Sequence, residues 1–292
     1  MSSRCFVDPS LAEPLRQARL DSVEGAFAYT GGADLSKANL GTRRRTQLTL
    51  TDDAGRPRLL FLKRYGPEPL LRRLRRWLAT GWHWSEAGAE FHAIGAVRSA
   101  GVPTMQTVAF EQESFRQGRS FILVSAVPGE ALERCGAAFF QKHAQTPAVL
   151  ESFTLKLADL VRKLHAAGLV HRDLYASHVF LHEHDGGADL YLIDLARVFA
   201  PRWRPFRWRV KDLAALRFSM ETQWVDRCWD AFLRHYLGSD DASLLAKWNR
   251  AVGAKADWMR CRADRREKRR QLTPNLQGSR PTPRGSDNEG LS

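Results

Sequence analysis

The sequence HAAGLVHRDLYASHVFLHE (residues 165–183), followed by DLYLIDLAR (residues 189–197), decides the fold of this chain. A helical pattern ends just before a loop that presents His-Arg-Asp and closes on Asp173. Two short apolar runs, separated by HDGGAD, then predict a hairpin whose second strand ends at Asp194. Such an arrangement suits phosphoryl transfer, because one carboxylate can orient an attacking hydroxyl while another holds magnesium on the phosphates.

The loop follows the catalytic pattern of kinases except at one position. That pattern is H-R-D-x-x-x-x-N, and here His178 stands in the place of the asparagine. Two other interpretations are a chance tripeptide and a zinc site built from the neighbouring histidines. The zinc site is disfavoured because no cysteine and no compact histidine pair on one helix face completes four ligands.

The segment from about Lys63 to Met220 resembles the lipopolysaccharide-core kinase family, the Kdo and heptose kinases. The matching pieces are FLKRY, AEFHAIGAVRSAGVPTM, HRDLYASHVFLH, LYLIDLARV and RWRVKDLAALRFS. In that family HRD is followed by a histidine at the magnesium position, and the later aspartate precedes leucine rather than Phe-Gly. The resemblance implies an α+β fold that is two-lobed and protein-kinase-like, with a small β-rich N-lobe and a mainly helical C-lobe.

The same resemblance implies roles for three residues of the central stretch. Asp173 is expected to be the catalytic base, or the carboxylate that orients the acceptor hydroxyl. Asp194 is expected to be the main ligand of Mg²⁺. His178 is expected to be a second contact on the metal side, or instead a hydrogen-bond partner of a phosphate or of Asp173.

In the N-lobe, Lys63 ends the apolar strand RLLFLK and is expected to bind the α- and β-phosphates of ATP. Glu90 resembles the helix glutamate that pairs with this lysine, although Glu86, one turn earlier, is a rival. Asp212 resembles the buried aspartate that braces the catalytic-loop backbone.

The loop that covers the phosphates is the least defined part of this site. No GxGxxG precedes the strand lysine, and GGADLSKANLGTRRR is the only glycine-bearing candidate. Its Lys37 and Asn39 are expected to reach the phosphates from a hairpin tip. The adenine is expected near SAVPGE, where the chain passes between the lobes.

Composition limits the class of protein. The chain has 292 residues, of which 43% are hydrophobic and 26% charged, as in globular proteins. Four dispersed cysteines encode neither a disulfide framework nor a zinc ribbon. Without a signal-like N-terminus or an apolar run of about eighteen residues, the sequence predicts a cytoplasmic protein that is soluble or peripheral. The resemblance implies that it is peripheral on the inner face of the cytoplasmic membrane.

The net charge of +13 is concentrated in three segments. Residues 42–76 hold eleven Lys/Arg against three acids, residues 197–217 seven against one, and residues 259–292 nine against four. A basic surface attracts polyanions without choosing among them. Nucleic acid is not the expected partner, because no reading motif or aromatic stacking platform is recognised. The oligomeric state cannot be read from this pattern.

The domain boundaries follow from changes in pattern along the chain. Residues 1–22 are interpreted as a loosely held N-terminal arm, residues 23–127 as the N-lobe and residues 128–258 as the C-lobe. Residues 259–292 are charged and then rich in Pro, Gly and Ser, which predicts a disordered basic tail.

A basic amphipathic helix is predicted near residues 68–82, with leucines and a tryptophan on one face and arginines largely on the other. One interpretation packs the leucines on the N-lobe and leaves the arginines in water. The other places the helix at an anionic membrane surface, with the apolar residues at the headgroup boundary.

The motifs favour an ATP- and Mg²⁺-dependent kinase, and the resemblance implies that it phosphorylates a sugar hydroxyl, of Kdo or heptose, in the lipopolysaccharide inner core. The acceptor would be the core glycolipid, and an anionic membrane surface is an expected partner. Basic residues after the hairpin are candidates for binding acidic sugars or phosphates: Arg202, Arg204, Arg207 and Arg209. The alternatives are a divergent protein kinase and a catalytically inactive binding module that keeps the fold.

Overall fold

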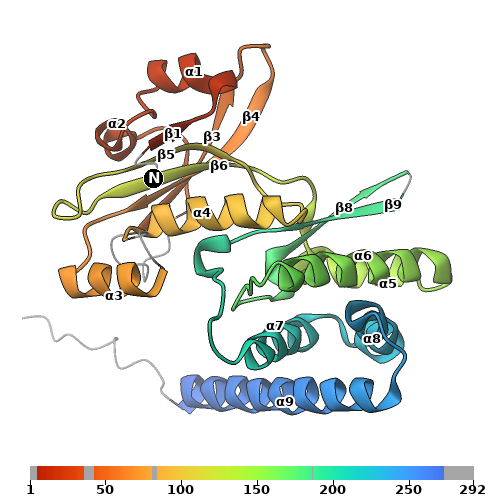
Figure 1. Ribbon diagram of the computed structural model, residues 1–292. Helices are drawn as coiled ribbons and strands as arrows, with labels where there is room; N and C mark the ends of the chain where they lie inside the picture. Colours follow the sequence, from red (N-terminus) through yellow and green to blue (C-terminus); the bar gives the residue numbers. More distant parts are fainter. Residues whose placement is uncertain (1–4, 36–42, 81–83, 186, 273–292) are drawn as a thin grey trace, which may run out of the picture.

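A six-stranded sheet forms the first lobe of the computed structural model, which describes residues 5–35, 43–80, 84–185 and 187–272 (Figure 1). Its strand order is β1-β5-β6-β4-β3-β2, and every neighbouring pair is antiparallel. The strands are β1 (Cys5–Val7), β2 (Ala33–Asp34), β3 (Arg43–Thr51), β4 (Pro57–Tyr65), β5 (Thr107–Gln112) and β6 (Ser120–Ser125). The hairpin predicted from the alternating pattern is therefore confirmed as β3 and β4.

Strand β6 explains how the sheet is covered on both faces. Phe121 and Leu123 belong to one buried cluster, whereas Ile122 and Val124 belong to another. Because successive side chains point to opposite faces, a strand that is apolar at every position needs a layer on each side. One of these layers is helix α4 (Glu86–Ser99), which Figure 1 shows under the sheet.

The other layer is built by the N-terminal residues, which the sequence analysis interpreted as a loose arm. That interpretation is wrong for the described residues. Strand β1 pairs with β5, and the segments η1 (Pro9–Leu11), α1 (Ala12–Gln17) and α2 (Val23–Ala28) follow it. Leu11, Leu15 and Leu20 are fully buried against the sheet. Leu11 and Leu15 are four residues apart, but the pattern does not continue to Leu20, so the sequence gives too short a periodicity to predict this layer.

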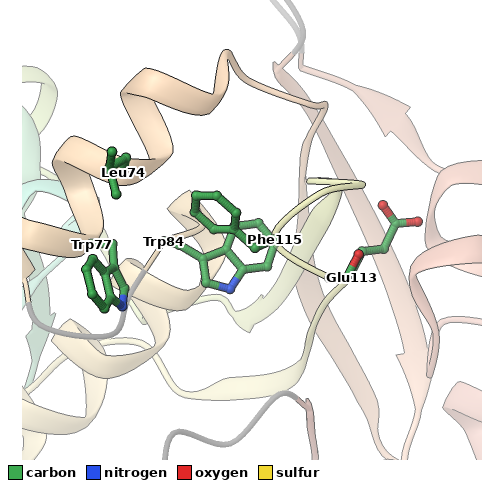
Figure 2. Close-up of a pocket in the computed structure, with 6 residues that line it drawn as sticks. Leu74, Trp77, Trp84, Glu113 and Phe115 are labelled. Carbon is green, nitrogen blue, oxygen red and sulfur yellow. The ribbon is translucent and has the colours of Figure 1, made fainter.

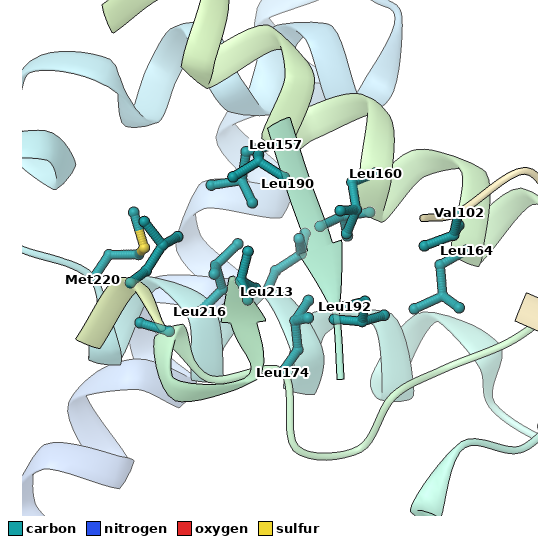
Figure 3. Close-up of a cluster of buried hydrophobic side chains, with 14 of the residues drawn as sticks. Val102, Leu157, Leu160, Leu164, Leu174, Leu190, Leu192, Leu213, Leu216 and Met220 are labelled. Atoms are coloured by element: carbon teal, nitrogen blue, oxygen red, sulfur yellow. The ribbon is translucent and has the colours of Figure 1, made fainter. Parts of the chain in front are cut away.

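The second lobe is mainly helical, as predicted. A small sheet of order β7-β8-β9 lies between its helices and the first lobe. Its elements are β7 (Glu130–Ala131), α5 (Leu132–Lys142), α6 (Pro147–Ala166), η2 (Ala176–His178), β8 (Val179–His184), β9 (Gly187–Leu192), η3 (Leu195–Arg197), α7 (Pro205–Ser219), α8 (Thr222–Leu237) and α9 (Ala242–Leu272). Figure 3 shows leucines of α6, β9 and α7 meeting in its core.

The two lobes are joined by more than the chain that passes between them. The chain leaves the first sheet at Ser125 and enters the second at Glu130, on either side of the predicted boundary. In addition, the Leu192 amide donates to the Pro103 carbonyl at 2.9 Å, and the Thr104 hydroxyl donates to the Leu192 carbonyl. The end of β9 is thereby held against the N-lobe.

The C-terminal tail differs from the sequence expectation. Helix α9 continues to Leu272, so the prediction of disorder from residue 259 is wrong for residues 259–272, whereas residues 273–292 lie outside the described part. Local contacts support this helix: Lys255 and Arg262 both lie over the Trp258 ring, at 3.6 and 5.2 Å from its centroid. Within the described residues, no helix has the length and apolar content needed to span a membrane.

Candidate active site

Lys63 and Glu90 form a buried ion pair between β4 and α4. Lys63 Nζ lies 2.5 Å from Glu90 Oε1, and the Tyr65 hydroxyl donates to the other carboxylate oxygen at 2.9 Å. The Glu90 carboxylate is fully buried, while Lys63 is 11% exposed at its side chain. Strand alternation puts Lys63 on the sheet face that α4 covers, because Leu62 and Arg64 turn to the opposite face. The ammonium is therefore fixed beside the second lobe.

The rival glutamate, Glu86, has other partners. Its carboxylate accepts from Arg43 at 2.5 Å and from Arg76 at 3.2 Å. Burial raises the pKa of Glu86, and its hydrogen bond and charge interaction with Arg43 oppose that effect. The structure thus brings Glu90, and not Glu86, to the strand lysine.

Asp194 follows β9 and faces the N-lobe lysine. Its backbone lies in the left-handed region with φ of 57°, a conformation that costs energy in a non-glycine residue and is concentrated at functional sites. Burial acts to raise the pKa of Asp194, but Lys63, Arg45 and His178 outweigh it, so the pKa lies below its ordinary value. The carboxylate stays ionised in a cationic environment.

His178 connects this carboxylate to the catalytic loop. Its Nδ1 lies 2.7 Å from the Asp173 carbonyl oxygen, which can only accept, so Nδ1 carries the proton. Nε2 lies 3.6 Å from Asp194 Oδ2. In the neutral ring this tautomer leaves the Nε2 lone pair beside Asp194, as a metal ligand requires.

Mg²⁺ usually takes one or two protein carboxylates and completes its shell with phosphates and water. The described residues contain no cluster of three or more His, Cys, Asp or Glu side chains able to hold a metal. Asp194 with His178 fits this pattern of few protein ligands, since each presents an electron pair to the same space.

The Asp173 carboxylate is held by two cations that sequence analysis missed. Arg197 Nη1 lies 2.5 Å from Oδ2, and Lys211 Nζ lies 3.9 Å from Oδ1. Lys211 also donates to the Arg172 carbonyl. Burial lowers the pKa of Lys211, and Asp173 partly offsets this. Their positions in the sequence could have indicated this role, because Arg197 is three residues after Asp194 and Lys211 directly precedes Asp212.

Asp212 supports the catalytic loop as expected. Its Oδ2 accepts from the His171 backbone amide at 2.6 Å and lies 3.3 Å from His165 Nε2. The His165 Nδ1 lies 2.8 Å from the Tyr236 hydroxyl, so a buried chain of polar groups runs from the loop into α8. The His171 ring lies 3.0 Å from the Ile193 carbonyl, next to Asp194. His171 therefore connects the two loops: its amide is held by Asp212, and its ring contacts the residue that precedes Asp194.

The remaining residues predicted from the sequence have no observed place in this site. Lys37 and Asn39 lie outside the described residues. Arg209 donates to the His165 carbonyl at 2.9 Å, which gives it a structural partner, whereas Arg202, Arg204 and Arg207 are exposed.

Arg45 is a further residue that the sequence analysis missed. It pairs with Lys63 in the β3–β4 register and acts electrostatically on Asp194, so it is a second cation at the nucleotide side. The signal for it was its place in the hairpin, directly opposite the strand lysine.

The arrangement can position a phosphorylated nucleotide against an acceptor. Lys63 and Arg45 supply positive charge from the N-lobe, Asp194 and His178 face them, and Asp173 lies five residues before His178 in the same loop. Phosphoryl transfer depends mainly on such positioning and charge neutralisation.

Comparison with known proteins agrees with this geometry. Residues 43–236 match the family model described as the lipopolysaccharide kinase (Kdo/WaaP) family. Among curated proteins, the chain is similar to the lipopolysaccharide core heptose(I) kinase WaaP of Pseudomonas aeruginosa, with 31% identity over 65% of this chain and 72% of that protein. It is also similar to the WaaP of Escherichia coli, with 30% identity over 78% of this chain and 86% of that protein.

A solved structure is similar as well. The chain matches that of WaaP in complex with acyl carrier protein with a TM-score of 0.62 and 25% identity, over 90% of this chain and 99% of the other. The similarity extends beyond the motif region to almost the whole described fold.

Proposed function

The chain belongs to the lipopolysaccharide kinase (Kdo/WaaP) family, and from that membership we propose that it transfers the γ-phosphoryl group of ATP to a sugar hydroxyl of the lipopolysaccharide inner core. Three curated relatives are named core heptose(I) kinases, which favours heptose over Kdo as the accepting sugar. One observation carries the proposal: the Lys63–Glu90 pair, Asp194 and the Asp173 loop meet where the two lobes join.

The part of the site that would bind the nucleotide contains an ion pair, in which Glu90 neutralises the charge of Lys63. Lys63 binds the phosphates while Glu90 holds its ammonium in place, so little side-chain entropy is lost when ATP binds. Asp194 and His178 would hold Mg²⁺, which would supply positive charge to neutralise the phosphates. Arg45, the cross-strand neighbour of Lys63, adds a second cation on the same face of the sheet.

On the acceptor side, Asp173 orients the sugar hydroxyl and receives its proton. Arg197 and Lys211 keep this carboxylate in place before the acceptor arrives. Serine/threonine protein kinases usually carry a lysine two residues after the catalytic aspartate, where this chain has Tyr175. Lys211 supplies an ammonium beside the aspartate from α7 instead, and it would stabilise charge on the transferred group.

The alternatives account for less of the geometry. A protein kinase needs an activation segment and a platform for a peptide, and only eighteen positions separate Asp194 from Asp212 (212 − 194 = 18). An inactive binding module needs no buried Lys63–Glu90 pair, because a buried ion pair costs desolvation that a scaffold can avoid. Because the inner core is built on a lipid, the protein would work at the cytoplasmic face of the membrane.

The test is phosphoryl transfer by the purified full-length protein from labelled ATP, with Mg²⁺, to inner-core glycolipid or to a generic protein substrate. Label is expected in the glycolipid, and mass spectrometry then locates the phosphate on heptose or Kdo. Asp173→Asn should lower the turnover by about 10²–10⁴-fold, while Asp189→Asn, an exposed carboxylate on β9, should not. Label in the protein substrate alone would refute the proposal.

A further inference from the structure

Helix α3 (Leu70–Thr80) turns its apolar face to the solvent. The exposed fractions are 57% for Leu70, 68% for Leu71, 43% for Leu74, 37% for Trp77 and 63% for Leu78. Arg73, on the other face, is only 4% exposed. Amphipathic helices normally bury the apolar stripe, so this helix is reversed relative to the interpretation that packs its leucines on the N-lobe.

Arg73 fixes this orientation. Its Nη1 donates to the carbonyl oxygens of Phe115, at 2.5 Å, and Arg116, at 3.2 Å, in the turn between β5 and β6. Its guanidinium lies directly over Gly118, where an added Cβ would come within 2.1–2.3 Å of it. Gly118 also has φ of +86°, a conformation that side chains rarely adopt. The turn is therefore shaped to receive an arginine.

Arg76 makes a second attachment one turn along the helix. It donates to Glu68 at 2.6 Å, to Glu86 at 3.2 Å and to the Trp84 carbonyl at 3.1 Å. Largely buried arginines with several acceptors resist rotation of the helix, because any rotation leaves desolvated charges unpaired. The outward position of the leucines is thus built into the fold.

The exposed face continues into an open groove of about 410 Å³ (Figure 2). Leu74 and Trp77 of α3 lie on one side of it, and Trp84 and Phe115 form an edge-to-face pair at 5.8 Å on the other. Tryptophan and leucine together are typical of segments that sit at the boundary between headgroups and acyl chains.

Charge around this face favours an anionic surface. Arg72 is 71% exposed at its side chain, and Arg116 is exposed in the turn below it. Arg72 belongs to the segment of residues 42–76, which carries eleven basic and three acidic residues, although Lys63, Arg64 and Arg73 of this segment are buried. Each basic residue near an anionic leaflet contributes about 1 kcal/mol of binding free energy.

We propose that the leucine face of α3, with the adjoining Trp77–Phe115 groove, inserts into the headgroup region of an anionic lipid bilayer, while Arg73 and Arg76 hold the helix in the orientation that this requires. The inference rests on the proposed function, since a lipid-linked acceptor has to be reached at a membrane. The inference adds that α3 is the element that contacts the bilayer.

The experiment measures co-sedimentation of the full-length protein with vesicles of phosphatidylglycerol and phosphatidylethanolamine, and with vesicles of phosphatidylcholine alone. Wild-type protein should bind the anionic vesicles. The double variant Leu71→Gln/Leu78→Gln should bind at least tenfold more weakly, without a change of charge. Leu59→Gln is the matched control, because Leu59 is 41% exposed at the far end of β4.

Two readouts separate this inference from the proposed function. Phosphorylation of a delipidated, water-soluble core acceptor should be the same in wild type and the double variant; its absence in both would refute the proposed function and leave the vesicle result standing. Fluorescence quenching by brominated lipids should be strong in wild type and reduced in Trp77→Phe, because Trp77 is at the insertion face.

The inference is overturned if wild-type protein does not bind anionic vesicles, or if the double leucine variant binds them as well as wild type does. It is also overturned if the leucine substitutions leave sedimentation unchanged but abolish a complex with acyl carrier protein, the protein found with the similar solved WaaP. In that case the face is covered by a protein.

Discussion

Helices α3 and α4 follow each other in the same lobe, yet they place their charged and apolar side chains in opposite ways. Helix α4 buries Ala87, Ile94 and Val97 and admits one charge, Glu90, which Lys63 neutralises. Helix α3 buries Arg73 and leaves its leucines exposed. In both helices the buried charge decides the orientation, because it is the group for which a wrong neighbour costs most.

The largest effect should come from removing the charge that α4 buries. Glu90→Ala leaves the Lys63 ammonium without its partner, so the free energy of unfolding should fall by about 3–5 kcal/mol. Phosphoryl transfer should fall by at least about 10²-fold, because the ammonium loses its position. Urea unfolding and the transfer assay measure the two effects.

Glu86→Ala is the matched control, one helical turn earlier. It breaks contacts with Arg43 and Arg76 but none with the strand lysine. Transfer to a soluble acceptor should therefore persist. An equal loss of transfer in both variants would contradict the assignment of Glu90.

On α3, replacing an arginine should destabilise the protein more than replacing a leucine, because here the arginine is buried and the leucine is exposed. Arg73→Ala removes hydrogen bonds to two carbonyls and should lower the free energy of unfolding by about 1–3 kcal/mol. Leu71→Ala, on the exposed face, should change it by no more than about 0.5 kcal/mol. Thermal and urea unfolding of the two variants decide the point. A larger loss for the leucine would show that this face is packed in solution.

The turn between β5 and β6, which contacts Arg73, should itself contribute to stability. Gly118→Ala places a methyl group against the Arg73 guanidinium and strains the backbone, so the free energy of unfolding should fall by about 1–2 kcal/mol. In the double variant Arg73→Ala/Gly118→Ala the steric clash is absent. The loss in free energy of unfolding should therefore be smaller than the sum of the losses in the two single variants. Strict additivity would argue against contact between the two.

The smallest effect concerns His171, a buried and titratable ring that lies outside both helices. His171 Nδ1 has no hydrogen-bond partner in the described part of the chain, and burial lowers the pKa of this ring below 6.5. The unfolded chain therefore binds the proton more readily, and stability is full above about pH 6.5 and declines as the pH falls toward the folded-state value.

His171→Gln should flatten this dependence. The difference between the two proteins, measured by urea unfolding at pH 7 and pH 5, should be about 1 kcal/mol or less. Identical slopes would mean that His171 titrates equally in the folded and unfolded states, which would contradict the prediction.

The comparison of α3 with α4 also shows which features the sequence could predict. The hairpin follows from regular alternation and the catalytic loop from a short motif, whereas the Lys63–Glu90 pair was expected from the family resemblance, and the structure brings these two residues together. The amphipathic pattern of α3 was evident too. Which face turns inward was not, because Gly118 and two carbonyl oxygens about forty residues away decide it.

Two further differences have equally local causes. The N-terminal leucines help to bury one face of the sheet, although only Leu11 and Leu15 have helical spacing and the pattern does not continue to Leu20. The charged stretch after Trp258 is helical because of contacts between successive turns, such as Arg260 with Asp257 and Arg262 over the indole. Composition alone predicts disorder there, since it does not register the pairing of neighbours.

The N-terminal layer has a practical meaning for anyone who trims the protein. A chain beginning at Asp21 would lack β1, so the outer edge of β5 would be open to pairing with another molecule. It would also uncover Leu60, Leu62 and Phe121 of the sheet. Shortening at this end therefore invites aggregation, and fusion partners belong ahead of the first strand.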